Sequence, residues 1–194
     1  MDREEFWALI EAAKATTGGD CQAQTAHLTA ALRRWSVSDV LDYHHIHSWL
    51  MAQSYRLPLW GAAYLINGGC SNDGFDYFRG WLLGQGRAAW QAALADPDSL
   101  ASHPQVRARA SQRERFDTLD CEAMWGVAWD AYEALTGQQL TVEVADMHPW
   151  PAELQEEDWD PGEDWDFDDA AEVRRRYPRL WALYGWDDTP SATP

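Results

Sequence analysis

The stretch from residue 70 to residue 79 holds the side chains best suited to chemistry. Asp73, Asp76 and Arg79 follow one another at intervals of three, so on a helix they lie near one face. Two carboxylates beside a guanidinium could position a substrate or carry out acid and base catalysis. The same positions also suit a helix cap, a first-turn acid and an intrahelical ion pair. The sequence leaves both interpretations open.

Cysteine offers a second candidate at this corner. Cys70 follows two glycines and precedes a predicted helix, where the pKa of a thiol can fall. A nucleophile also needs a base, and His44, His45 or His47 could approach in space, whereas a small buried cysteine is the structural alternative. The three cysteines, Cys21, Cys70 and Cys121, are an odd number at wide spacing and no CxxC occurs, so we predict neither a disulfide framework nor a zinc ribbon, and a reducing compartment fits best.

A histidine-rich segment, "DYHHIHSW" at 42–49, offers a third candidate. His44 and His47 are three residues apart, so on a helix both could point toward a metal ion if a third ligand came from elsewhere. Histidines with a structural role are the alternative. The sequence indicates no particular cofactor.

An acidic, aromatic segment near the end of the chain is a candidate for partner binding. Residues 153–172 contain eleven acidic residues and no basic one. Trp159, Asp164, Trp165 and Asp166 could bind a basic protein surface, because charge steers association and tryptophan holds it. The alternative is an intramolecular clasp with the basic residues that follow, Arg174, Arg175, Arg176 and Arg179.

Charge and composition restrict the class of partner. The 194 residues carry a formal charge of −17, which argues against nucleic acid and against an anionic membrane surface, and permits a basic protein. The start of the chain has no basic flank and apolar run of the kind that makes a signal peptide, and no stretch approaches the ~20 apolar residues of a membrane span. We therefore expect a cytoplasmic protein. The single lysine and the abundant alanine suggest a high-GC bacterium.

Apolar residues at helical spacing set the expected fold. The pattern predicts helices over 2–17, 20–35, 38–56, 58–67, 71–85, 87–95 and 119–136. The longest β-like alternation is "LTVEVAD" at 140–146. We therefore predict an all-α protein with a single orthogonal domain of about six to seven helices. This domain covers 1–148, and an acidic aromatic extension over 149–194 ends in a short arginine-rich helix.

Residues 59–87, "LWGAAYLINGGCSNDGFDYFRGWLLGQGR", followed by "ALADPDSLA", resemble the bacterial domain-of-unknown-function family 4240. The resemblance spans roughly residues 3 to 137. It implies an α-helical cytosolic domain of a kind frequent in actinomycetes, and it brings no catalytic residue with it. The "HHIH" run and the acidic extension are features of this chain.

Two functions follow as expectations. The first is a protein-interaction or ligand-binding module with a basic partner, for example an inhibitor, an immunity-like protein or a regulator. The second is a small enzyme with its site at the Cys70–Arg79 corner, assisted by His44 and His47 or by a metal.

Overall fold

The computed structural model describes residues 1–111, 118–154 and 160–186. The described residues form helices and no strand, which confirms the all-α prediction. The α-helices are α1 (Arg3–Thr17), α2 (Cys21–Leu32), α3 (Val37–Gln53), α4 (Leu57–Asn67), α5 (Asn72–Gly84), α6 (Arg87–Ala95), α7 (Pro104–Ala110), α8 (Val127–Thr136), α9 (Val142–Asp146), α10 (Ala170–Arg176) and α11 (Pro178–Tyr184). Two 3-10 helices, η1 (Pro97–Ser102) and η2 (Glu122–Gly126), complete the described elements.

Helix ends follow the local signals in the sequence. Asp2 and Glu5 form a reciprocal capping box at the start of α1, and Gly18 closes this helix with a φ of 68°. The structure contains more helices than the predicted six to seven, because short helical segments lie between and after the long ones. One of them, α9, occupies the "LTVEVAD" segment: the side chain of Thr141 caps it by accepting from the Val144 N–H.

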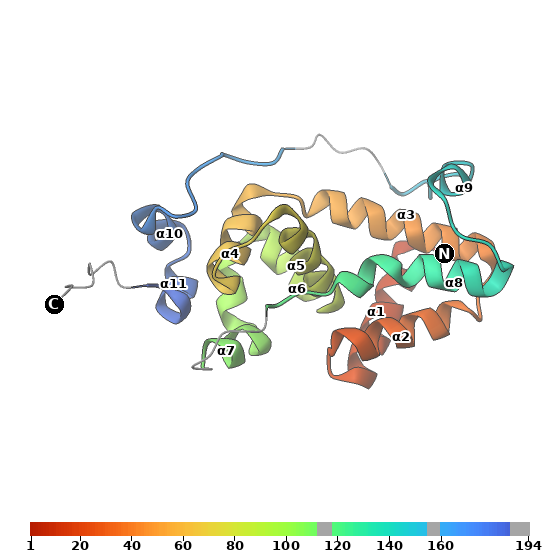
Figure 1. Cartoon of the computed structure of the whole chain (residues 1–194), viewed down its shortest axis with the longest axis horizontal. Helices are drawn as coiled ribbons and strands as arrows, with labels where there is room; N and C mark the ends of the chain where they lie inside the picture. Colours follow the sequence, from red (N-terminus) through yellow and green to blue (C-terminus); the bar gives the residue numbers. More distant parts are fainter. Residues whose placement is uncertain (112–117, 155–159, 187–194) are drawn as a thin grey trace.

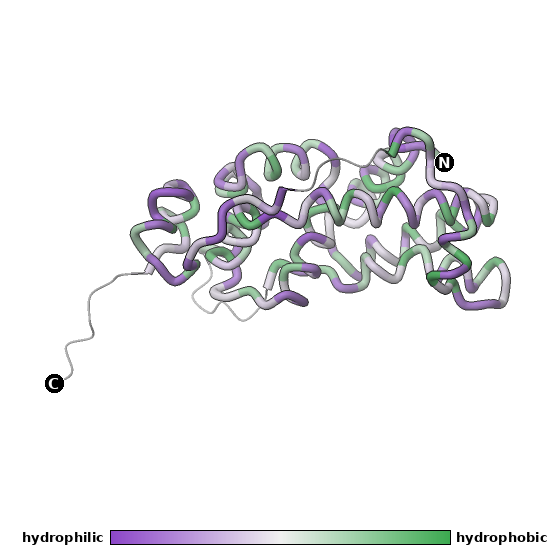
Figure 2. Tube along the Cα trace, turned by 90° about the horizontal axis from the view of Figure 1, so that it is seen from above, coloured by the Kyte–Doolittle hydropathy of each residue, from purple (hydrophilic) through white to green (hydrophobic). Residues whose placement is uncertain are grey.

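The long helices form two groups. α8 lies alongside both α2 and α3, and α1 packs against α2, whereas α4 to α7 lie between this group and the C-terminal helices α10 and α11 (Figure 1). Apolar and polar segments alternate along the helices in Figure 2. The apolar faces meet in one hydrophobic cluster that includes the fully buried Phe6, Leu28, Ile46 and Phe78.

The C-terminal helices belong to the same packed body. α11 lies against α4, α7 and η1, and α10 precedes it (Figure 1). Val173, Tyr177, Leu180 and Tyr184 are buried in the cluster formed by the earlier helices. The apolar faces of α10 and α11 are therefore part of the hydrophobic core, whereas Arg174, Arg175 and Arg179 are exposed.

A disulfide joins Cys21 to Cys121, which are 100 positions apart in sequence and have 5.6 Å between their Cα atoms. The prediction that the cysteines form no disulfide was wrong. Cys121 packs against α5, since a Cβ at Gly80 would lie 2.5 Å from the Cys121 carbonyl oxygen, and α2, which begins at Cys21, also contacts α5. Helix packing of this kind cannot be read from cysteine spacing. Since disulfides persist mainly in oxidising compartments, the cysteines no longer support the prediction of a reducing compartment.

Candidate functional site

The corner between α4 and α5 is a helix–turn–helix connection. Gly68 and Gly69 have φ values of 70° and 123°, a conformation that glycine adopts without strain. Ser71 then caps α5 by accepting a hydrogen bond from the Gly74 N–H at 3.1 Å. Asp73 lies exposed in the first turn, where a carboxylate stabilises the helix dipole. The turn residues therefore serve helix geometry.

Arg79 is the buried charge of this corner and is 3% exposed. Its guanidinium donates to the Met51 carbonyl oxygen and to the Asp76 carboxylate. It also lies over the rings of Tyr55 and Phe75, at 4.9 and 5.0 Å from their centroids. Burial lowers the pKa of Arg79, and Asp76 opposes that effect. Both terminal nitrogens are thus engaged within the protein.

A recess of about 480 Å³ borders Arg79, with Ser48, Met51, Ala52, Tyr55 and Trp125 as its other lining residues. Neither Asp73 nor Cys70 lines it. Asp76 does not line it either. The structure therefore pairs Asp76 with Arg79, and Arg79 alone of the four predicted catalytic residues borders this recess.

Cys70 is half-buried, and its surroundings disfavour a thiolate. Burial and the nearby Asp76 carboxylate raise the pKa of the Cys70 thiol to about 11. This shift is opposite to the lowered pKa that activates a nucleophilic thiol. The indole N–H of Trp60 donates to the Cys70 backbone carbonyl at 3.0 Å, so this part of the corner is tied to the core.

The histidines of α3 have separate environments. His47 is buried between Tyr43 and Trp125, and burial lowers its pKa to about 3. His44 is half-buried, and burial also lowers its pKa. Within the described part of the chain, no group of three His, Cys, Asp or Glu side chains could hold a metal ion. His44 and His47 therefore gain no third ligand there.

His45 has a role that the sequence did not reveal. Its Nε2 hydrogen-bonds the Ala145 carbonyl at 3.1 Å, and its ring stacks on Trp150 at 4.5 Å. These contacts fasten α9 and the residues after it to α3. No periodic signal links residue 45 to residue 145, so the sequence could not have shown this contact.

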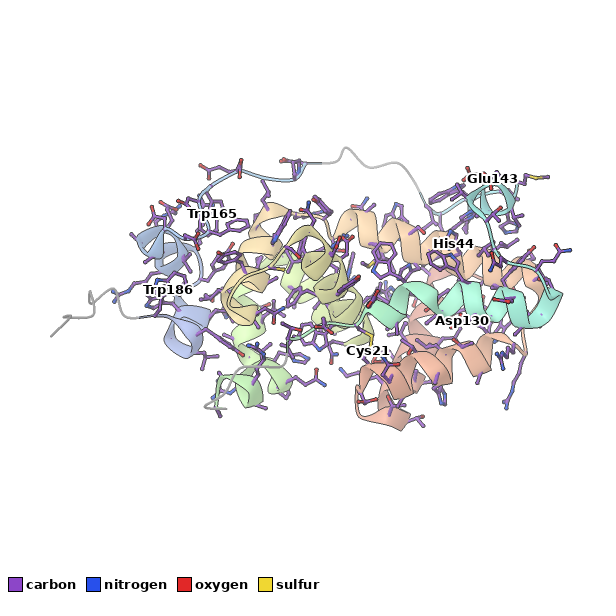
Figure 3. All side chains as sticks on the ribbon, viewed as in Figure 1. Cys21, His44, Asp130, Glu143, Trp165 and Trp186 are labelled. Carbon is purple, nitrogen blue, oxygen red and sulfur yellow. A yellow bond between two sulfur atoms is a disulfide. The ribbon has the colours of Figure 1, made fainter. Side chains whose placement is uncertain are left out.

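The predicted partner-binding residues fall into two groups. Trp165, labelled in Figure 3, is half-buried against α4 and lies 4.8 Å from the Arg176 guanidinium carbon. Asp164 and Asp166 are exposed, whereas Trp159 lies outside the described residues. Arg176 pairs with Glu163 at 2.7 Å, as the clasp alternative predicts.

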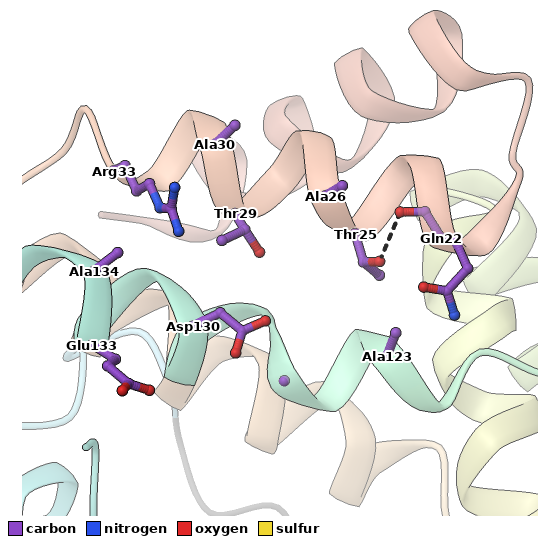
Figure 4. A pocket seen from close by; sticks show the side chains of 11 residues that line it. Gln22, Thr25, Ala26, Thr29, Ala30, Arg33, Ala123, Asp130, Glu133 and Ala134 are labelled. Atoms are coloured by element: carbon purple, nitrogen blue, oxygen red, sulfur yellow. Dashed lines mark hydrogen bonds between the residues drawn. The ribbon is translucent and has the colours of Figure 1, made fainter. Parts of the chain in front are cut away.

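A further groove, of about 620 Å³, lies between α2 and the η2–α8 segment (Figure 4). Its floor and α2 wall consist largely of small or hydroxylated residues, whereas Asp130 and Glu133 stand on the α8 wall. Both carboxylates are exposed, and neither has an ion-pair partner within 4 Å among the described residues. Arg33 lines the α2 side of the groove. This groove could not be predicted from the sequence, because it depends on the pairing of α2 with α8, which is a tertiary contact.

Comparison with known proteins places the chain in a family. A family described as protein of unknown function (DUF4240) matches residues 1–134, which include the Cys70–Arg79 corner and both walls of the α2–α8 groove. No curated protein and no solved structure matches the chain. In the described parts of the chain, no helix is both long and apolar enough to cross a membrane. Because the match covers more than half of its length, the chain belongs to the DUF4240 family.

Proposed function

We propose that the protein is an interaction module that binds a basic protein through the α2–α8 groove. The observation that carries this proposal is the pair of exposed carboxylates, Asp130 and Glu133, beside a floor of small side chains. A lysine or arginine side chain of a partner can enter the groove and pair with these carboxylates. An inhibitor, an immunity-like protein or a regulator would use such a contact.

The charge of the whole molecule supports this class of partner. A formal charge of −17 attracts a basic protein at long range and repels nucleic acid. Asp164 and Asp166 form a second exposed acidic surface. They flank Trp165, which lies far from Asp130 along the molecule (Figure 3). Trp165 packs within the protein. In this proposal the two aspartates therefore attract the basic partner, and Trp165 does not contact it. A cytoplasmic location stays a prediction.

An apolar anchor stands next to the acidic wall. Trp129 is 49% exposed and precedes Asp130 on α8. Tryptophan is among the residues that most often dominate interface energies. A partner that inserts a basic side chain into the groove can therefore also cover the Trp129 ring.

Carboxyl–amine cross-linking in cell extract, followed by mass spectrometry, tests the proposal. We expect cross-links from Asp130 or Glu133 to lysines of one basic protein. The variant Asp130→Asn/Glu133→Gln should lose most of the capture, because it removes both carboxylates of the groove. Asp164→Asn/Asp166→Asn is the matched control, since it removes the same charge from the other acidic surface and should retain most of the capture.

Two results would contradict the groove as the binding site. The first is an equal loss of capture in both double variants, which would assign binding to net charge alone. The second is a captured partner that is acidic. Raising the salt concentration should weaken capture by the wild-type protein, because exposed charges are screened within about 8–10 Å at physiological ionic strength.

The enzyme hypothesis has one favourable observation, the recess beside Arg79. The raised pKa of Cys70 and the internal pairing of Arg79 weigh against it. We therefore do not adopt it as the proposed function.

A further inference from the structure

A groove of about 370 Å³ between α1, α3 and α6 has a chemistry unlike the rest of the surface. It is lined by three arginines, Arg3, Arg56 and Arg87, and by no aspartate or glutamate among its described lining residues. Basic residues number 15 against 32 acidic ones in the whole chain. A local cluster of positive charge in an acidic protein favours an anionic ligand.

The arginines are available for such a ligand. Arg56 donates through Nε to the Gln53 carbonyl at 2.9 Å, and it has no carboxylate within 4 Å in the described ranges. Arg3 and Arg87 pair with Glu153 and Glu4, but all four side chains are more than a third exposed. Exposed pairs of this kind contribute little to stability. An anion in the groove can therefore replace these carboxylates as the partner.

Three tryptophans, Trp7, Trp49 and Trp90, supply the aromatic wall. The rings of Trp7 and Trp90 lie 5.9 Å apart, and Arg3 lies 5.3 Å from the Trp49 ring. Trp49 is half-buried, so part of its surface remains for a planar ligand. Trp90 is 8% exposed, and its indole N–H has no hydrogen-bond partner among the described residues. A buried donor without a partner carries a desolvation cost.

Two glutamines, Gln53 and Gln91, complete the polar lining. A side-chain amide offers both donors and an acceptor, which suits the edge of a nucleobase. Aromatic rings stack on bases, and arginine forks bind phosphate. Trp7 and Trp90 are 5% and 8% exposed, so the half-buried Trp49 offers most of the aromatic surface for a base. We propose that this groove binds a nucleoside 5′-monophosphate, with the base against the exposed part of Trp49 and the phosphate on the arginines. Its volume lies in the range of roughly 300–1,000 Å³ typical of small-molecule sites.

This site is independent of the proposed protein interaction. It shares no lining residue with the α2–α8 groove. A single nucleotide also differs from a nucleic-acid strand, whose many phosphates the net negative charge repels. The two proposals can therefore fail separately.

Isothermal titration calorimetry with AMP, GMP, CMP and UMP tests the site on the full-length protein. We expect at least one of them to bind with a Kd below about 1 mM. The matching nucleoside, ribose 5-phosphate and inorganic phosphate should each bind at least about tenfold more weakly, because each lacks one half of the recognition. Equal binding of inorganic phosphate would reduce the site to a simple anion contact and overturn the proposal.

Variants assign the binding to the groove. Arg56→Gln should weaken nucleotide binding about tenfold, because a hydrogen bond to a charged group is lost. Trp49→Leu should do so to a similar extent through lost stacking. Arg107→Gln is the matched control, since it removes the same charge from an exposed position on α7 and should leave binding unchanged. Thermal unfolding by circular dichroism confirms that each variant is folded.

Three results reject the site. These are the absence of binding by all four nucleotides, an unchanged affinity in both folded groove variants, and equal weakening by Arg107→Gln.

Discussion

The buried carboxylate of Asp98 binds the start of α11 at Arg179. It accepts hydrogen bonds from the Arg179 backbone N–H at 3.0 Å and from the Arg179 Nε at 2.9 Å. Its other oxygen accepts from the Leu180 N–H at 2.8 Å. Asp98 thus caps a helix that begins eighty residues later in the chain, and it does so from within the matched family region.

Replacing Asp98 by alanine should lower the free energy of unfolding by about 2–3 kcal/mol, because buried N–H donors and a guanidinium lose their acceptor. Arg179→Gln is the control: Arg179 is 50% exposed, so we expect a clearly smaller loss than for the Asp98 variant. Urea denaturation measures both. Equal stability of the Asp98 variant and the wild type would contradict the capping role.

The sequence predicted the long helices well because their signals are local. The capping box at Asp2, the stops at Gly18 and Gly68, and the Ser71 cap all act within a few residues. The short α9 and α11 carry weaker local signals. Thr141 caps α9, whereas the distant Asp98 caps α11. Their existence depends on tertiary contacts, which spacing does not encode.

For the candidate sites, too, local features could be predicted from the sequence and tertiary contacts could not. The spacing of Asp76 and Arg79 predicted their ion pair. The grooves were not predictable, since each forms between helices whose pairing is a property of the fold. Likewise, the sequence offered Trp165 for partner binding or for an intramolecular clasp, but it could not show that Trp165 packs on α4, because this contact depends on the glycine at position 61.

The disulfide can be tested by counting thiols. Under denaturing conditions without reductant, one thiol per chain should react, that of Cys70. Cys21→Ser should lower the free energy of unfolding by about 2–4 kcal/mol, since the bridge restricts a long loop in the unfolded chain. Cys70→Ser is the matched control and should change stability little. Three reactive thiols in protein isolated without reductant would show that the bridge does not form.

Gly61 lets the segment around Trp165 pack on α4. A Cβ at this position would lie 2.6 Å from both the Trp165 ring and the Tyr177 hydroxyl oxygen. Gly61→Ala should therefore destabilise the protein by about 1–3 kcal/mol, as overpacked cores do. At Gly126 the nearest atom is 3.9 Å away, so Gly126→Ala is a control that should be neutral or slightly stabilising. Thermal unfolding of both variants measures the difference, and equal effects would argue against a tight Trp165 contact.

The buried histidines should make stability fall in acid. Burial lowers the pKa of His47 from 6.5 to about 3, so below pH 6.5 the unfolded chain binds a proton that the folded protein does not. Stability then decreases as the pH falls from 6.5 toward 3, by up to about 1.4 kcal/mol per pH unit. His47→Gln should flatten this dependence over the whole window. In His103→Gln the flattening should end near pH 4, because the pKa of His103 is lowered to about 4. Urea denaturation from pH 7 to pH 3 measures the slopes, and a wild-type slope that His47→Gln leaves unchanged would assign the acid sensitivity to other groups.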